Sequence, residues 1–162
     1  MPKIRVLLTD DHQLFREGMA NILNSQPDFE VIGEASDGLE ALIKARELEP
    51  DLILMDIDLG KGKMDGTAAA QAVLQQKELP IVFLTSHTEK AMVDQVQGIT
   101  SYGYVVKNSG EFVLVQSIEM AFRLFGTTRE LREENAQHRA TRASLAESRR
   151  FLSSTLEAIQ EG

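Results

Sequence analysis

The stretch LILMDIDLGKGKMDG, residues 52–66, decides how the rest of the chain is interpreted. Its apolar beginning ends at Asp56, a second aspartate follows at Asp58, and a glycine- and lysine-rich turn leads to Asp65 and Gly66. A short, continuously apolar run of this kind is typical of a strand that is covered on both faces. Either Asp56 or Asp58 could then be a nucleophile, a metal ligand or a plain turn former.

Four more short apolar runs occur in the first 125 residues, and segments with helical spacing separate all five. Strand and helix therefore alternate with short connections, which predicts βαβ units around a parallel sheet. The second strand alternates more than the others and is expected at an edge, whereas the first, third and fourth should be central. The predicted strands are 4–9, 29–35, 51–56, 80–85 and 102–106, and the predicted helices are 13–24, 38–48, 66–77, 88–98 and 110–125.

Composition narrows the class of protein. Of the 162 residues 43% are hydrophobic, so a core can form, and the absence of cysteine excludes disulfides, thiolate metal sites and a cysteine nucleophile. No apolar run approaches the roughly 20 residues of a membrane span, and the N-terminus lacks a signal-peptide layout. The net charge of −8 lies within residues 1–125. We therefore expect a cytoplasmic protein without membrane insertion or direct nucleic-acid binding, and with room for a divalent cation.

The sequence changes character after residue 125. Residues 126–162 hold six acids and six bases, and apolar residues repeat there at a spacing of seven. Such a sustained heptad repeat predicts a coiled-coil segment that continues the last helix of a domain over 1–125, and favours a parallel dimer with Asn135 fixing the register. Gly126 is a candidate break, and the alternative is an amphipathic helix folded back on its own domain. The expected dimer seam comprises Leu124, Leu131, Asn135, Leu145, Leu152, Leu156 and Ile159.

Polar side chains end most of the predicted strands. Ligands bind at the carboxyl ends of strands in an open parallel sheet, so these side chains should converge on one edge. Three carboxylates at close range repel one another, and a divalent cation with oxygen ligands such as Mg²⁺ would relieve this repulsion. One aspartate could then attack a phosphoryl group held by a lysine and a hydroxyl. The converging residues are Asp10, Asp11, Asp56, Thr85, Ser86 and Lys107.

These motifs resemble the receiver domain of two-component response regulators. The resemblance covers residues 3 to about 125 and implies a flavodoxin-like, doubly wound α/β fold. Its five-stranded parallel sheet would have the order 2-1-3-4-5, with helices on both faces, and here a long C-terminal helix would follow. The matching motifs are LTDDH (8–12), PDLILMDIDL (50–59), MDG (64–66), VFLTSH (82–87) and SYGYVVKNS (101–109).

The resemblance also implies roles for individual residues. Asp56 would accept a phosphoryl group from a histidine kinase or a phosphotransfer protein, without further enzymatic activity beyond self-phosphorylation and self-dephosphorylation. The change would then spread to the surface of the fourth and fifth helices and the fifth strand, which could also take part in a dimer. The implied ligands of Mg²⁺ or Mn²⁺ are Asp10, Asp11, Asp56 and the backbone carbonyl of Asp58. The implied phosphate-binding and switch residues are Thr85, Ser86, Tyr104 and Lys107.

Several positions depart from the family pattern or are open to two interpretations. Asn108 follows Lys107 where the family usually has proline in a cis bond, so we predict a trans bond, because a cis bond before a non-proline residue costs about 2.5–4 kcal/mol. Asp58 and His87 occupy positions that tune phosphate lifetime in the family, although His87 could simply start a helix. His12 is expected to be an exposed helix-start residue, and His138 a polar residue of the coiled-coil seam.

Two other functions are compatible with parts of the sequence. The motif DID (56–58) matches the core of haloacid-dehalogenase-type phosphatases, but the acidic pair stands at the start of this chain rather than after the lysine. A receiver that is never phosphorylated and serves only as a dimerisation platform is the other alternative. The ending LAESRRFLSSTLEAIQEG (145–162) resembles linkers before PAS domains or other modules, so we expect the front part of a larger protein, such as a hybrid kinase.

Overall fold

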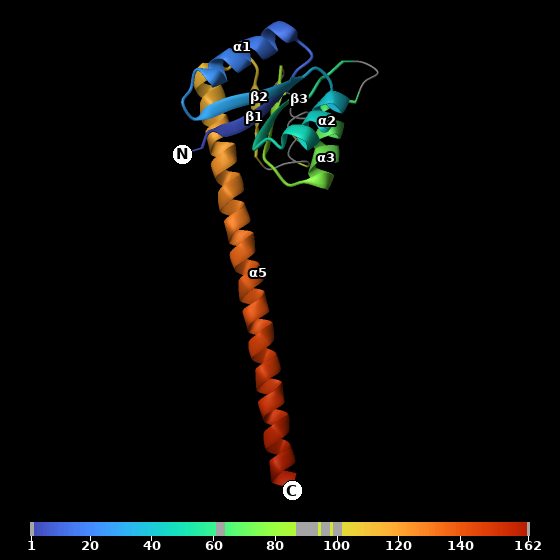
Figure 1. Ribbon diagram of the computed structural model, residues 1–162, viewed down its shortest axis with the longest axis vertical. Coiled ribbons are helices and arrows are strands. Elements are labelled where there is room, and N and C mark those ends of the chain that lie inside the picture. The colour runs from blue at the N-terminus through green and yellow to red at the C-terminus, as the bar shows by residue number, and fades with distance from the viewer. Residues whose placement is uncertain (1, 61–63, 87–93, 95–97, 99–101, 162) are drawn as a thin grey trace. The chain divides into compact units, whose positions relative to one another are not determined.

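Five parallel strands form a single sheet in the order β2-β1-β3-β4-β5 (Figure 1). The computed structural model describes residues 2–60, 64–86, 94, 98 and 102–161. The predicted order is confirmed, with β2 at an edge and β1, β3 and β4 in the interior of the sheet. The strands are β1 (Ile4–Thr9), β2 (Phe29–Ala35), β3 (Leu52–Asp56), β4 (Ile81–Thr85) and β5 (Tyr104–Val106).

Helices cover both faces of this sheet, as the doubly wound fold requires (Figure 1). Successive residues of a strand point to opposite faces, so Leu54 packs with α1 and α5 whereas Ile53 and Met55 pack with α2 and α3. Every residue of β3 is buried, which explains why its sequence is continuously apolar before Asp56. The helices are α1 (Gln13–Asn24), α2 (Gly38–Leu48), α3 (Gly66–Gln76) and α5 (Glu111–Glu161).

Aspartates begin two of the helices. Asp37 caps α2 by accepting a hydrogen bond from the Glu40 amide at 2.8 Å, and Asp65 caps α3 by accepting one from the Ala68 amide at the same distance. The Asp65-Gly66 turn therefore has a structural role at the start of α3. Of the predicted helix 88–98, only Asp94 and Gly98 belong to the described residues.

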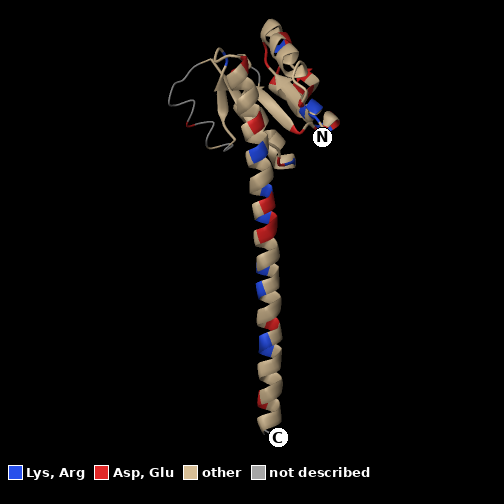
Figure 2. Cartoon of the chain, turned by 90° about the vertical axis from the view of Figure 1, so that its left-hand side faces the viewer, with Lys and Arg blue, Asp and Glu red and all other residues tan. Residues whose placement is uncertain are grey.

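The chain divides into a compact unit, Met1–Phe125, and a helical unit, Gly126–Gly162. The candidate break at Gly126 does not occur, because α5 continues without interruption from Glu111 to Glu161. A single glycine costs only about 1 kcal/mol in a helix interior, and a long helix tolerates this cost. Acidic and basic residues are interspersed along the second unit (Figure 2). In the part of the chain that the structure describes, no helix is long and apolar enough to cross a membrane.

The peptide bond between Lys107 and Asn108 is trans, as predicted, and no cis bond occurs among the described residues. The turn that follows β5 is closed instead by a hydrogen bond from the Ser109 amide to the carbonyl oxygen of Val106, 3.1 Å long, and by Gly110 with a φ of 97°. Glycine suits this left-handed backbone conformation because it has no Cβ.

Candidate functional site

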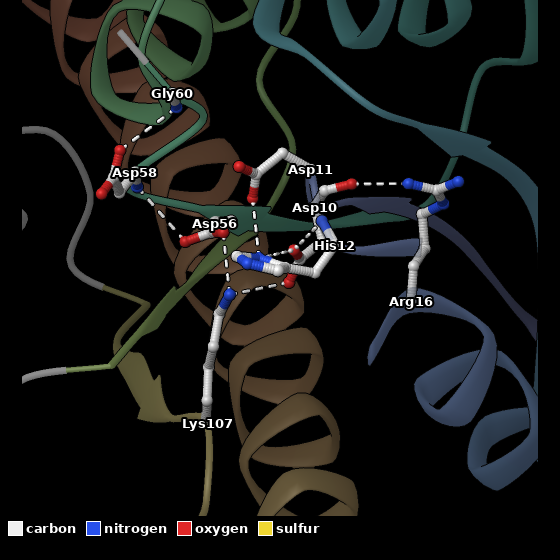
Figure 3. Close-up of polar contacts among 8 residues, drawn as sticks. All are labelled: Asp10, Asp11, His12, Arg16, Asp56, Asp58, Gly60 and Lys107. Carbon is white, nitrogen blue, oxygen red and sulfur yellow. Dashed lines mark hydrogen bonds and ion pairs between the residues drawn. The ribbon is translucent and has the colours of Figure 1, made fainter. Parts of the chain in front are cut away.

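Two buried carboxylates and one ammonium group meet at the carboxyl edge of the sheet (Figure 3). Lys107 Nζ lies 2.8 Å from Asp56 Oδ2 and 2.9 Å from Asp10 Oδ2. The side chains of Asp10, Asp56 and Lys107 are 0%, 4% and 10% exposed. Three residues that lie far apart in the sequence therefore form one buried charged cluster, as the strand ends predicted.

The register of the sheet places these residues together. Thr9 pairs with Met55 and Asp56 pairs with Leu84, so Asp10, just beyond β1, comes beside Asp56, the last residue of β3. The Lys107 amide donates a 2.8 Å hydrogen bond to the carbonyl oxygen of Thr85, which continues the ladder between β4 and β5 past the end of β5. The backbone of the sheet thus places the three residues of the cluster close together, independently of the contacts between their side chains.

Burial sets the protonation behaviour of Asp56. Desolvation raises the pKa of Asp56 from its ordinary 3.8 to about 6, although the hydrogen bond and charge of Lys107 act in the opposite direction. Burial alone would lower the pKa of Lys107, but its pairing with Asp56 and Asp10 outweighs this effect and leaves the pKa raised. Lys107 therefore stays charged at neutral pH, whereas Asp56 changes its charge not far below neutrality.

This raised pKa predicts that Asp56→Asn stabilises the fold at pH 7 in the absence of divalent ions. A carboxyl whose pKa is higher in the folded state contributes stability below about pH 4, and this contribution is lost as pH rises through 6. Removing the charge should therefore raise the free energy of unfolding by on the order of 1–3 kcal/mol at pH 7. Urea titrations in EDTA at pH 7 and pH 4 measure the gain, which should shrink at pH 4. A variant no more stable than wild type at pH 7 would contradict the burial argument.

Asp58, the second aspartate of the opening motif, lies outside the buried cluster. Its side chain is exposed and accepts a hydrogen bond from the Gly60 amide at 3.2 Å, while its own amide donates to Asp56 Oδ1 at 3.2 Å. Asp58 therefore forms the turn that follows the strand. The two aspartates of the opening motif thus lie in different environments, Asp56 in the buried cluster and Asp58 in the exposed turn.

The other predicted site residues surround the cluster at different depths. Thr85 is buried at the end of β4, Ser86 is exposed, and Tyr104 is 38% exposed. Ser86 and Lys107 both line an open pocket of about 350 Å³ beside the cluster. His87 lies outside the described residues, so its predicted role stays a prediction.

Three residues contact the cluster that sequence reasoning did not assign to it. Arg16 donates from Nη1 to the carbonyl oxygen of Asp10 at 2.7 Å, and the ring of Phe15 lies 4.9 Å from Lys107 Nζ. His12 is exposed at the start of α1, as expected, but its Nδ1 lies 3.0 Å from Asp11 Oδ1. The position of His12 directly after the acidic pair is a sequence feature that could have indicated its contact with the cluster. The sequence contains no comparable feature for Arg16 or Phe15.

The donor set fits a divalent cation. One ligand atom from each of Asp10, Asp11, His12 and Asp56 lies within 4.8 Å of the others. Oδ2 of the buried Asp10 accepts no hydrogen bond within the described residues, and its contact with Lys107 is an ion pair without hydrogen-bond geometry. A buried carboxylate oxygen in this state favours a cation, and oxygen-rich donor sets suit Mg²⁺ or Mn²⁺.

The fold and the site define a class of protein: an open α/β domain with a buried aspartate–lysine cluster at the carboxyl edge of its sheet. The model of the response regulator receiver domain matches residues 6–119. The chain belongs to this family of phosphoacceptor domains. The alternative hypothesis of a haloacid-dehalogenase-type phosphatase is therefore replaced by this assignment.

Individual relatives agree with this assignment. The transcriptional regulatory protein LiaR from Bacillus subtilis is 43% identical over 119 residues, which is 73% of this chain and 56% of LiaR. The chain thus spans about half the length of such curated relatives. The N-terminal domain of a response regulator/sensory box/GGDEF three-domain protein from Carboxydothermus hydrogenoformans is 44% identical, with a TM-score of 0.69 over 76% of this chain and 98% of that one. The NarL receiver domain from Mycobacterium tuberculosis is 32% identical, with a TM-score of 0.70 over 76% and 98%.

Proposed function

We propose that this chain is a phosphorylation-controlled signalling receiver in which Asp56 accepts a phosphoryl group from a histidine kinase or a phosphotransfer protein. The observation that carries the proposal is the buried contact of Asp56 with Lys107 and Asp10 beside an open pocket. An ionised oxygen of Asp56 would attack phosphorus, a P–O bond would form and the P–N bond of phosphohistidine would break. The leaving imidazole nitrogen would keep the electron pair of that bond and take up a proton.

Asp10, Asp11, Asp56 and the backbone carbonyl of Asp58 would hold Mg²⁺ or Mn²⁺ in this proposal. The bound ion would offset the negative charge that builds up on the transferring phosphoryl group. Lys107 is now paired with two carboxylates, and it would exchange them for phosphoryl oxygens because a dianionic group is the stronger partner. Ser86, which lines the same pocket, would contact the same group.

Thr85 and Tyr104 would transmit the effect of phosphorylation from Asp56 to the surface of the domain. Thr85 ends β4 next to the site, and Tyr104 begins β5 with its ring 38% exposed. In the proposed switch, the Thr85 hydroxyl moves toward the phosphoryl group and the Tyr104 ring turns inward behind it, which alters the surface around β5 and α5. Asp58 and His87 would tune how long the phosphoryl group persists.

Beryllofluoride, which mimics a phosphoryl group on aspartate, tests this assignment. With Mg²⁺ it should raise the melting temperature of the wild-type chain, because a ligand that binds only the folded state stabilises it. Asp56→Asn should show no such shift, and Asp58→Asn, which changes the exposed neighbour, should keep it. An unshifted wild type would favour the alternative of a dimerisation platform that is never phosphorylated.

We propose further that residues 1–125 are the receiver and that residues 126–162 are a helical linker at the front of a larger cytoplasmic protein, and that this chain makes no direct contact with nucleic acid. The similar Carboxydothermus domain comes from a protein that also contains sensory box and GGDEF domains, which supports this organisation. Any kinase or other enzymatic activity would then lie in further domains.

The helical unit is expected to form a parallel dimer. Its large apolar side chains are exposed in the single chain, among them Leu131, Leu145 and Leu152 at 56%, 60% and 61%. Burial of such a heptad seam would drive association. Sedimentation equilibrium should give twice the chain mass of 18.0 kDa. Leu145→Glu with Leu152→Glu should give a monomer, whereas Ala140→Glu, off the seam, should not. A monomeric wild type would contradict the dimer.

A further inference from the structure

His12 lies directly beside the acidic pair at the start of α1 (Figure 3). Its Nδ1 is 3.0 Å from Asp11 Oδ1 and 3.5 Å from Asp10 Oδ1, and its amide donates to the same Asp10 oxygen at 2.8 Å. The backbone of His12 is thus fastened to the buried carboxylate of the cluster. Its side chain makes no capping hydrogen bond at the helix start, so capping does not account for the orientation of the ring.

The spacing of the donor atoms fits a common metal ion. Divalent ions bind oxygen or nitrogen ligands at about 2.0–2.2 Å, so neighbouring ligands of an octahedral ion are roughly 3 Å apart. The two Nδ1 distances of 3.0 and 3.5 Å are close to this value, and all four donor atoms of the group lie within 4.8 Å of one another. One ion could therefore contact Nδ1 of His12 together with the carboxylates.

The chemistry of the imidazole determines which ion such a set would prefer. Mg²⁺ strongly favours oxygen ligands, whereas imidazole nitrogen suits transition ions. We propose that His12 is a nitrogen ligand of the divalent ion at this site and gives the site a preference for transition ions such as Mn²⁺ over Mg²⁺. This inference rests on the proposed metal site, and it adds a ligand that selects the ion.

A purely local ion pair between His12 and Asp11 would not produce this selectivity. Their side chains are 72% and 32% exposed, and ion pairs between exposed side chains contribute little to stability. Such a pair would also respond equally to Mg²⁺ and Mn²⁺, because it would sense only the charge of the ion. A preference for Mn²⁺ over Mg²⁺ that depends on His12 therefore distinguishes a metal ligand from a residue that only lies near the ion.

The test compares Mn²⁺ and Mg²⁺ binding by the full chain and its histidine variants. Calorimetry gives both dissociation constants, and electron spin echo modulation of bound Mn²⁺ detects a coordinated imidazole nitrogen. In His12→Ala the Mn²⁺ affinity should fall at least about tenfold, the Mg²⁺ affinity should stay within about twofold, and the nitrogen signal should vanish. His138→Ala, in the helical unit, is the matched control that should keep both the affinity and the signal.

Each other outcome overturns the proposal. A nitrogen signal that persists in His12→Ala, or equal changes in both affinities, would show that His12 is not the ligand, while the metal site itself would stand. Asp10→Asn tests the metal site separately from the His12 ligand. This substitution should lower the affinity for both Mn²⁺ and Mg²⁺ whether or not His12 is a ligand. A wild-type chain that binds neither ion would overturn the metal site together with this inference.

Discussion

Lys107→Met is expected to lower the free energy of unfolding by about 3 kcal/mol at pH 7 without divalent ions. The substitution leaves the carboxylates of Asp10 and Asp56 buried without their shared cation, and removing one partner of a buried ion pair typically costs about 3–5 kcal/mol. It also removes the contact of the ammonium group with the Phe15 ring. Urea denaturation in EDTA measures the loss.

Added Mg²⁺ should restore part of this lost stability, because the ion supplies positive charge to the same carboxylates. Acidification from pH 7 to pH 5 should also reduce the deficit, since protonation of Asp56 removes one of the unpaired charges. Arg129→Met is the control: Arg129 pairs with Glu133 between two exposed side chains of α5, and its loss should cost less than about 1 kcal/mol. A Lys107→Met deficit that is equally small, or indifferent to Mg²⁺, would mean that the lysine does not balance these charges.

Gly66→Ala is expected to destabilise the fold by about 3 kcal/mol or more and to displace Asp56, the proposed phosphoacceptor. A Cβ on Gly66 would lie 1.9 Å from the carbonyl oxygen of Asp56 and 2.8 Å from its carbonyl carbon. Both are backbone atoms at the end of a fully buried strand, so no side-chain rotation relieves the overlap. The Gly66 amide also donates to the carbonyl oxygen of Ile57 at 2.9 Å, and a shift of the helix start would break this bond.

Gly126→Ala provides the control for this second prediction. A Cβ at Gly126 meets nothing within 4 Å, and the residue lies in the interior of α5. Alanine is the better helix former by about 1 kcal/mol, so this variant should be slightly stabilised. Thermal denaturation and Mg²⁺ affinity of both variants measure the contrast. Equal melting temperatures for the two substitutions would contradict the close packing at Gly66.

The strands were predictable because buried parallel strands leave a simple pattern. A strand such as 52–56 is covered on both faces and so reads as a continuous apolar run, and β2, at an edge, alternates instead. The convergence of Asp10, Asp56 and Lys107 followed from the rule that parallel strands end on one edge. The predicted starts of some strands differ from the observed starts by one or two residues, as in β5. Apolar residues outside the strands extend the predicted runs.

Contacts that depend on packing rather than on pattern were not predictable. Nothing in the sequence around Gly66 indicates that its Cα packs against the Asp56 carbonyl, and nothing indicates that the Arg16 guanidinium reaches the carbonyl of Asp10. At Gly126, too, local helix propensity alone does not decide the structure, since the long helix α5 continues through this residue. The distinction between Asp56 and Asp58 was expected from the sequence, because the apolar run ends at Asp56 and the family resemblance implies that Asp56 is the phosphoacceptor.

Phosphoryl transfer to Asp56 is the reaction that a receiver of this kind must carry out. The wild-type chain is incubated with Mg²⁺ and a small phosphodonor, and intact-mass spectrometry counts the added phosphoryl groups. We expect one acid-stable, base-labile phosphoryl group per chain on the wild type and on Asp58→Asn, and none on Asp56→Asn. An unlabelled wild type, or a label that remains on Asp56→Asn, would contradict it.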